Sequence, residues 1–510
     1  MSCQTDAEFQ PGNRHAESLL ILISAAILAA SILSAEPLQS ANDRSRWATV
    51  WSLVERGTYQ IDEIDQLTRF RTIDKVRHRL SEDEPWHFYS SKPPLLSTIV
   101  AGLYWVERHT IGLGLFQHTA FVVRLLLMFV NWLPMCLALL SLRRTLHFVK
   151  ASEATRLFVL AFAGMGSLLN PYLASLNNHT PAAICAVFCV SAIVRLTYAR
   201  SARQFVCPAD MAILGFNAAL CSCFELPAAL FGILAFLLAV QCDLRKTAWA
   251  FIPAALLPLA AFLITNWICT GGIKPFYMYY GTEKYEYIHN GVPSYWMNPQ
   301  DLDANTESWT TYLFHCLLGH HGLFSLTPAL LLIIPGFYCL LFCQPNAASS
   351  STQNEQTPPQ STLLRPVLLI GALLSTVTLT FYLTRTANYN YGGNSVALRW
   401  MLWLTPFWWL MMVPALEFLL RTKKTQWLCL LLLAGSIFTV SWSHNRPWKP
   451  SWLYVAMEQT GIISYRTPRP PKAPPVGKTP PEATTPPETP ASTPPQTEDS
   501  PADSTPPQNQ

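Results

Sequence analysis

The first residues that could do chemistry follow the first strongly apolar run of the chain. Residues 42–48 are Asn-Asp-Arg-Ser-Arg-Trp-Ala. A carboxylate at the membrane surface can take the proton of a hydroxyl group during a transfer reaction. Asp43 is therefore a candidate site residue, with Arg46 as a possible substrate contact. The alternative is that Asp43 only caps the helix that follows it.

A second candidate is the lysine in residues 89–96, Tyr-Ser-Ser-Lys-Pro-Pro-Leu-Leu. The two prolines fix the chain direction before an apolar helix and suit its first turn. Lys92 would then stand at the N-terminal end of that helix, where a cation and a helix end together favour an anion. The alternative is that Lys92 only snorkels along an apolar surface.

Three further positions carry polar groups next to apolar runs. His179 lies in Asn-Asn-His-Thr before Pro181, and Glu225 stands between two apolar stretches. A charge near the membrane suggests function, although a helix cap or simple exposure explains each equally well. His320 and His321 are adjacent and so do not share a helix face to chelate one metal together. One of them could join a carboxylate around a divalent ion; packing is the favoured alternative.

Aromatic residues form the last candidate group. Residues 389–394 are Tyr-Asn-Tyr-Gly-Gly-Asn and lead to Arg399. Rings, amides and flexible glycines suit contact with a sugar, so Tyr391 is a possible substrate contact. The same residues also suit an interfacial aromatic belt, as do the tyrosines of residues 277–287.

These residues must be positioned by a membrane protein. Half of the 510 residues are hydrophobic and 13% are charged, against about 25% charged in soluble domains. The net charge of +4 is scattered, which gives no footprint for nucleic acid. Most of the 13 cysteines lie in apolar runs, where they are expected to be small buried residues rather than a disulfide framework.

The hydropathy pattern predicts an all-α polytopic protein. A span needs about 20 apolar residues, and we predict eleven spans, near residues 18–35, 118–142, 156–175, 181–198, 210–224, 226–241, 247–267, 322–343, 366–384, 400–420 and 425–443. A tight hairpin is expected at Glu225-Leu226-Pro227. The first run is long for a signal peptide and is taken as an uncleaved span.

The basic residues of the short loops set the orientation. With these spans, the four loops rich in Lys and Arg fall on one side, which is then cytoplasmic. The N-terminus, residues 1–17, is placed inside and the C-terminus outside. Residues 36–117 and 270–321 become long outer loops, and residues 93–112 an interfacial helix. Chemistry is expected at this outer face, in a bacterial inner membrane.

Two segments have compositions that cannot bury enough surface to fold. The cytoplasmic linker 344–362 is rich in Ser, Thr, Gln and Pro, and the tail 466–510 repeats Thr-Pro-Pro. The membrane domain is therefore expected to cover residues 18–465.

The layout resembles the membrane glycosyltransferases of the GT-C type, which include protein O-mannosyltransferases and lipid A aminoarabinose transferases. Their acidic motif after the first span matches Asp43, Arg46, Trp47 and Ala48. Their Lys-Pro-Pro-Leu-Leu segment matches residues 92–96, and an arginine opening the next span matches Arg124. The likeness departs at Arg44 and Ser91, where the family often has acids. It is clearest over residues 37–130.

The resemblance implies inverting transfer of a sugar from a polyprenyl-phosphate donor to a lipid, glycan or protein acceptor at the outer face. Asp43 would be the base. Lys92, with Arg124 and Arg399, would stabilise the leaving phosphate. A divalent metal is a further implied cofactor. Two alternatives stay open: a lipid or glycan flippase, and an envelope glycan-binding protein without catalysis.

Overall fold

The computed structural model describes residues 14–304, 307–342, 358–385 and 391–465. The described chain is mainly helical. Its longer helices are α1 (Arg14–Ser34), α2 (Ala41–Arg56), α4 (Pro94–Thr110), α6 (Leu133–Phe148), α8 (His179–Ser201), α9 (Pro208–Phe224), α10 (Ala229–Cys242), α12 (Ile252–Thr270), α16 (Gln360–Leu383) and α19 (Lys423–Ser443). The shorter ones are α3 (Asp62–Asp65), α5 (Thr119–Leu127), α7 (Glu153–Ala161), α11 (Leu244–Lys246), α13 (Trp309–Leu317), α14 (Leu323–Leu326), α15 (Ile333–Phe342), α17 (Thr405–Met411), α18 (Val413–Leu419) and α20 (Trp452–Gln459).

Seven helical stretches of this part are long and apolar enough to cross a membrane: His15–Ser34, Thr119–Phe148, His179–Ser201, Leu244–Thr270, Gln360–Leu383, Arg399–Leu419 and Lys423–Ser443. Three shorter apolar helices lie at Pro208–Phe224, Leu226–Cys242 and Pro328–Phe342. The fold is therefore a multi-pass helical one, and the predicted count of eleven spans is not confirmed.

The predicted span 156–175 is broken into three pieces. After α7 come a π-helical turn, η2 (Phe162–Gly166), and a 3-10 turn, η3 (Asn170–Ala174). Gly164 lies against α1, where a Cβ atom would overlap the Ser24 side chain. Pro171 then cannot donate a backbone hydrogen bond to an α-helix. Close approach to α1 and one proline thus replace a straight span by an irregular segment.

The predicted span 322–343 is broken in a similar way. It consists of α14, a 3-10 turn, η9 (Pro328–Leu332), and α15. The predicted hairpin at Glu225 is present, because α9 ends at Phe224 and a short 3-10 turn, η4 (Leu226–Ala228), leads into α10.

The predicted first outer loop, 36–117, folds into a compact group of elements. Ser40 caps α2 by accepting a hydrogen bond from the Asp43 amide at 3.1 Å. The antiparallel strands β1 (Lys75–His78) and β2 (His87–Ser90) pair Val76 with Tyr89. α4 begins at Pro94 as expected. A second, two-residue pair, β3 (Ile288–His289) and β4 (Val292–Pro293), belongs to the loop 270–321.

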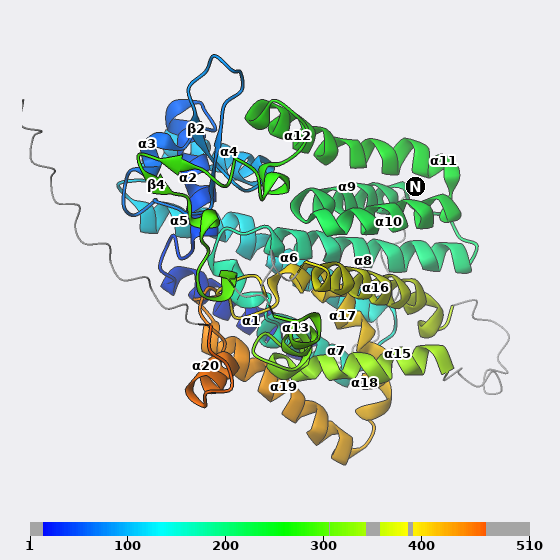
Figure 1. The fold of residues 1–510 in the computed structure, drawn as a ribbon. Coiled ribbons are helices and arrows are strands. Elements are labelled where there is room, and N and C mark those ends of the chain that lie inside the picture. The colour runs from blue at the N-terminus through cyan, green and yellow to red at the C-terminus, as the bar shows by residue number, and fades with distance from the viewer. Residues whose placement is uncertain (1–13, 305–306, 343–357, 386–390, 466–510) are drawn as a thin grey trace, which may run out of the picture. The chain divides into compact units, whose positions relative to one another are not determined.

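The two ends of the helices differ in what they carry. Figure 1 shows α2, α3 and β2 grouped at the left end of the long helices, with α11 at the right end. α11 contains Arg245 and Lys246 of a predicted cytoplasmic loop. The candidate site residues of the loop 36–117 therefore lie at the end opposite to this basic turn.

A buried carboxylate ties the start of α1 to two other helices. Glu17 is 1% exposed, and it accepts hydrogen bonds from Arg143 Nε at 2.8 Å, His147 Nε2 at 2.7 Å and Arg156 Nε at 2.6 Å. A buried charge needs such partners. Glu17 thus fixes α1 against α6 and α7, a role that the sequence did not suggest.

Candidate active site

Asp43 stands in the first turn of α2 and is 1% exposed. Its Oδ1 accepts hydrogen bonds from Trp47 Nε1 and the Leu176 amide, both at 2.9 Å, and its Oδ2 accepts from the Gln39 amide at 3.0 Å. Burial raises the pKa of Asp43 to about 6, against the lowering effect of these hydrogen bonds. Asp43 therefore anchors α2 to the segment before α8 and keeps one lone pair of Oδ2 for a proton.

Arg46 lies one helical turn further along α2 and is also 1% exposed. Its Nη1 donates to the Asn42 side chain and its Nη2 to Asn178 Oδ1 at 2.6 Å. Its buried Nε contacts no acceptor among the described residues. Burial lowers the pKa of Arg46 to about 10, although Asp74 and Asp43 oppose this shift. A buried guanidinium with one unused donor suits an additional anionic or polar ligand.

Lys92 follows β2 and directly precedes the two prolines that open α4. Its Nζ is 3.2 Å from Asp74 Oδ1, and the two side chains are 20% and 12% exposed. Burial lowers the pKa of Lys92, Asp74 raises it, and the nearby Arg46 and Arg399 guanidinium groups lower it further. Lys92 is thus a partly accessible cation next to two other cations.

His179 and Glu225 come together although they belong to different helices. His179 is the first residue of α8, and Glu225 follows α9. The His179 Nδ1 hydrogen-bonds to Glu225 Oε1, which also accepts from Asn178 Nδ2 at 2.6 Å. Both side chains are buried. The alternative prediction that Glu225 is simply exposed to water is therefore wrong.

Arg399 begins the 3-10 helix η11 (Arg399–Leu404) and meets this pair. Its Nε donates to the Gly392 carbonyl at 2.8 Å, and its Nη1 is 3.4 Å from His179 Nε2. Its guanidinium carbon lies 5.3 Å from the centre of the Trp448 ring. Six of the predicted site residues thus converge from five segments of the chain.

We name this group the charged cluster. It consists of Asp43, Arg46, Asp74, Lys92, His179, Glu225 and Arg399. The mutual repulsion of Arg46, Lys92 and Arg399 is balanced by the carboxylates between them. The three cations are matched by the three carboxylates Asp43, Asp74 and Glu225, so an anion would be bound by donors that these carboxylates leave unused, such as Arg46 Nε.

Arg124 does not belong to the charged cluster. Its Nε and Nη2 donate to the Ala35 carbonyl at 3.2 and 2.9 Å. Ala35 follows the end of α1, where helix carbonyls lack intrahelical partners. Arg124 therefore has a visible structural function, the capping of α1, and its predicted contact with a donor phosphate stays a prediction.

Sequence reasoning missed three polar residues of this region. Asp74 pairs with Lys92, and Asn178 bridges Arg46 and Glu225. Asp303, from the loop 270–321, accepts from Tyr295 at 2.8 Å and interacts electrostatically with Asp74 and Arg399. Burial raises the pKa of Asp303. No spacing in the sequence links these residues; Asn178 alone stood next to a residue already singled out.

His320, His321 and Tyr391 form a second group. The Nδ1 atoms of the two histidines are 2.5 Å apart, and His320 Nε2 is 2.8 Å from the Tyr465 hydroxyl. The Tyr391 and Tyr465 hydroxyls both donate to Glu307. With Tyr312 and His315, these residues are the tyrosine–histidine cluster. Tyr389 and Asn390 of the predicted motif lie outside the described residues, as do most of the linker 344–362 and the tail 466–510.

Rings rather than charges hold the tyrosine–histidine cluster together. Tyr391 stacks on Tyr312 with ring centroids 4.5 Å apart, and His321 stacks on Tyr391 with ring centroids 5.3 Å apart. Burial lowers the pKa of His321 to about 3, and that of His320 falls even further. Both imidazoles are neutral near pH 7, which agrees with the packing alternative.

The described residues contain no ready-made site for a divalent metal. Over that part of the chain, no three His, Cys, Asp or Glu side chains are arranged to hold a metal ion. Glu225 Oε1 is occupied by Asn178 and His179, and Asp74 is paired with Lys92. No reaction step is therefore assigned to a metal.

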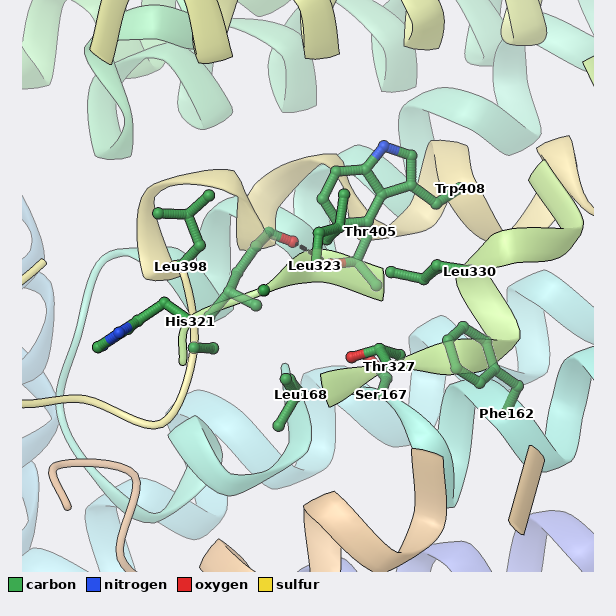
Figure 2. A pocket seen from close by; sticks show the side chains of 13 residues that line it. Phe162, Ser167, Leu168, His321, Leu323, Thr327, Leu330, Leu398, Thr405 and Trp408 are labelled. Carbon is green, nitrogen blue, oxygen red and sulfur yellow. Dashed lines mark hydrogen bonds between the residues drawn. The ribbon is translucent and has the colours of Figure 1, made fainter. Parts of the chain in front are cut away.

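An apolar cavity lies elsewhere in the bundle. Figure 2 shows His321 and Leu398 at one end of it and Phe162 and Leu330 at the other. Its volume is about 20 Å³, enough for about one water molecule. A sugar or a lipid phosphate does not fit there. The charged cluster is the candidate site because it gathers most of the predicted site residues.

Comparison with known proteins gives a distant structural likeness. No protein-family model and no curated protein matches the sequence. Similar solved structures are those of the Archaeoglobus fulgidus oligosaccharyltransferase. The apo form has 10% identity and a TM-score of 0.47, with 91% of this chain and 61% of that chain covered.

Two further structures of the same enzyme give comparable values. The complex with Zn and sulfate has 12% identity, a TM-score of 0.44 and coverage of 89% and 58%. The form tethered to an acceptor peptide has 11% identity, a TM-score of 0.44 and coverage of 86% and 56%. The chain thus spans about three fifths of the length of the solved chains. All three TM-scores are below 0.5.

Proposed function

We propose that the protein is a membrane glycosyltransferase that moves a sugar from a polyprenyl-phosphate donor to an acceptor at the outer face of a bacterial inner membrane. The observation that carries this proposal is the charged cluster. It brings Arg46, Lys92 and Arg399 together at the end of the apolar helices opposite to the basic turn of α11. A lipid-linked phosphate carries its charge at the membrane surface, where the ends of spanning helices are expected.

The donor phosphate is assigned to Lys92 and Arg399. When the sugar leaves, negative charge develops on the phosphate oxygens, and fixed cations at that place stabilise the transition state. Lys92 is 20% exposed and so reaches the solvent side. Arg399 can donate to a phosphate oxygen through Nη2, since its Nε and Nη1 already contact Gly392 and His179. Arg46 lies behind them and adds a third positive charge.

The role of general base is assigned to Asp43, and Asp74 is the other carboxylate of the charged cluster that could take this role. An acceptor hydroxyl must lose its proton as it attacks the sugar. Oδ2 of Asp43 has one lone pair left beside the Gln39 contact. Asp74 is more exposed, yet its Oδ1 is paired with Lys92. The raised pKa of Asp43 favours proton uptake from an alcohol over that by an ordinary aspartate.

The test is a transfer assay with purified protein, radiolabelled polyprenyl-phosphate sugars and a membrane extract as acceptor. Lys92→Ala is compared with Lys75→Ala. Both lysines pair with an aspartate of the first loop, since Lys75 contacts Asp65. The proposal requires that Lys92→Ala abolishes transfer and Lys75→Ala does not. Equal activity of both variants would refute the phosphate site. A folded protein that transfers no sugar would favour the flippase or binding-protein alternatives.

A further inference from the structure

Arg399 is held from three directions. The Gly392 carbonyl accepts from its Nε, His179 Nε2 lies 3.4 Å from its Nη1, and the Trp448 ring lies over the guanidinium. Its Nη2 donates to no described residue. The guanidinium is therefore oriented with one nitrogen left for a ligand. A planar fork binds phosphate well only when its plane is fixed.

The tautomer of His179 follows from its two neighbours. An arginine side chain only donates hydrogen bonds. His179 Nε2 must therefore accept, so the ring proton is on Nδ1. That proton is donated to Glu225, a carboxylate that only accepts when ionised. The order of the three groups thus determines where each proton sits. A carboxylate that orients a histidine in this way fixes both its tautomer and its ring plane.

Glu225 is itself fixed by a further link. Its Oε1 accepts from Asn178 Nδ2, and Asn178 Oδ1 accepts from Arg46 Nη2, both at 2.6 Å. The chain of contacts therefore runs from Arg46 to Arg399 through one amide, one carboxylate and one imidazole. It joins α2, the start of α8, the end of α9 and the start of η11. All of these side chains except Asn178 and Arg399 are fully buried.

We infer that His179 and Glu225 are positioning residues, which hold the Arg399 guanidinium ready for the phosphate of a polyprenyl-phosphate donor. The inference rests on the proposed function. His179 Nε2 faces Arg399 rather than an open approach for an acceptor hydroxyl. A direct role of His179 in proton transfer would need that nitrogen to be turned towards the acceptor. The positioning role uses the contact that exists.

Two polar substitutions of His179 separate its two contacts. Gln places its amide near the position of Nε2 and can still accept from Arg399. Asn places its amide near Nδ1, keeps the contact with Glu225 and does not reach Arg399. Both residues are polar, so neither leaves an apolar group in the cluster. His179→Asn is expected to raise the donor KM by about 10- to 100-fold. His179→Gln should retain most of the donor affinity and most of kcat, whereas the loss of kcat in His179→Asn should be no larger than in Arg399→Ala.

Coupling to Arg399 is the second readout. If His179 acts through Arg399, the double variant with His179→Asn and Arg399→Ala should bind donor no more weakly than Arg399→Ala alone. His87→Asn is the matched control. His87 also contacts a carboxylate of the first loop, Asp62 at 3.3 Å, away from the charged cluster. Glu225→Gln should raise the donor KM in the same direction as His179→Asn. Thermal midpoints of all variants check folding.

The outcomes distinguish the two proposals. If Arg399→Ala and Lys92→Ala leave the donor KM unchanged, the phosphate site itself is wrong. If Arg399→Ala weakens the donor and His179→Asn does not, only the positioning role is wrong. A loss of kcat that is equally large in His179→Gln and His179→Asn would show direct chemistry by His179 and would overturn the positioning role. Additive effects in the double variant would overturn it as well.

Discussion

The charged cluster and the tyrosine–histidine cluster are neighbours that use opposite physics. Both include residues of the segment 391–399, since Tyr391 belongs to one and Arg399 to the other. In the charged cluster, buried cations face carboxylates and keep unused hydrogen-bonding capacity, as at Arg46 Nε. In the other, rings stack and two histidines are neutral. His315 Nδ1 and His321 Nε2 of the tyrosine–histidine cluster also lack a partner among the described residues, so the two clusters differ in charge: cations and carboxylates indicate a polar ligand site, whereas stacked neutral rings indicate a support.

The two clusters meet at one glycine. Gly392 has a φ of +87°, and its carbonyl accepts from Arg399 Nε. A Cβ atom there would be 2.8 Å from Arg399 Nε. The tyrosine–histidine cluster therefore fixes Tyr391, and the adjacent Gly392 positions Arg399 of the charged cluster. Variants can test whether transfer depends on one cluster and stability on the other.

The largest expected effect is on the base. Asp43→Asn should lower kcat by about 10²- to 10⁴-fold, because the amide cannot take a proton. With a pKa of about 6 for Asp43, the wild-type rate should fall in acid as this carboxylate is protonated. The measurement is kcat between pH 5 and 8. If Asp74→Asn abolishes transfer while Asp43→Asn retains it, Asp74 is the base and Asp43 is only the anchor of α2.

The next effect concerns the phosphate. Arg399→Ala should reduce kcat by about 10²- to 10³-fold, the usual cost of one lost donor to a developing charge. Tyr312→Phe in the tyrosine–histidine cluster is the comparison variant. It should lose much less kcat, since it keeps the ring that stacks on Tyr391. Equal losses in both variants would abolish the distinction between the clusters.

A smaller effect is expected at Gly392, which links the two clusters. Gly392→Ala should raise the donor KM by about 10-fold, because the added Cβ displaces Arg399 in addition to a strain of about 1–2 kcal/mol. Gly291→Ala is the matched control, with a φ of +75° and no atom near its Cβ position. Both variants carry the backbone strain, and only Gly392→Ala moves the arginine. A normal donor KM in Gly392→Ala would contradict the link.

The tyrosine–histidine cluster should make the folding stability of the protein depend on pH below neutrality. His321 has a folded pKa of about 3 against 6.5 for an exposed histidine, so the unfolded state binds more protons between these values. Stability is then lost as the pH falls below 6.5, by about 2 kcal/mol at pH 5. His321→Asn should remove this part of the acid sensitivity. The measurement is the difference between the thermal midpoints at pH 7 and pH 5, in wild type and in His321→Asn. An equal difference in both proteins would refute a buried neutral His321.

The smallest effect is at the tyrosine. Tyr391→Phe keeps the ring stack and removes the hydroxyl that donates to Glu307. The free energy of unfolding should fall by about 1 kcal/mol. The donor KM should stay within a factor of about three, since one such hydrogen bond rarely moves a packed ring. A large loss of transfer with normal stability would instead place Tyr391 in contact with the substrate.

Hydropathy and local sequence determined the general architecture of this protein. Apolar runs of about 20 residues can satisfy their backbone in a bilayer only as helices, so most predicted spans correspond to helices. The start of α4 at Pro94 and the turn at Glu225 follow from local chemistry and were predicted to within a residue or two, whereas the cap of α2 is Ser40 and not Asp43. The breaks at 162–174 and 323–332 were not predicted, because they depend on contacts with other helices.

Local sequence also determined which side chains were candidates, since acids, amides and lysines next to apolar runs need a reason to be there. Only the tertiary structure decided which of them meet. It separated Arg124 from Lys92, added Asp74 and Asn178, and assigned His320 and His321 to a neutral support. The reason is that a buried charge is stabilised by partners within a few ångströms, and some of those partners, such as Asn178 for Arg46 and His179 for Arg399, lie more than a hundred residues away in the chain.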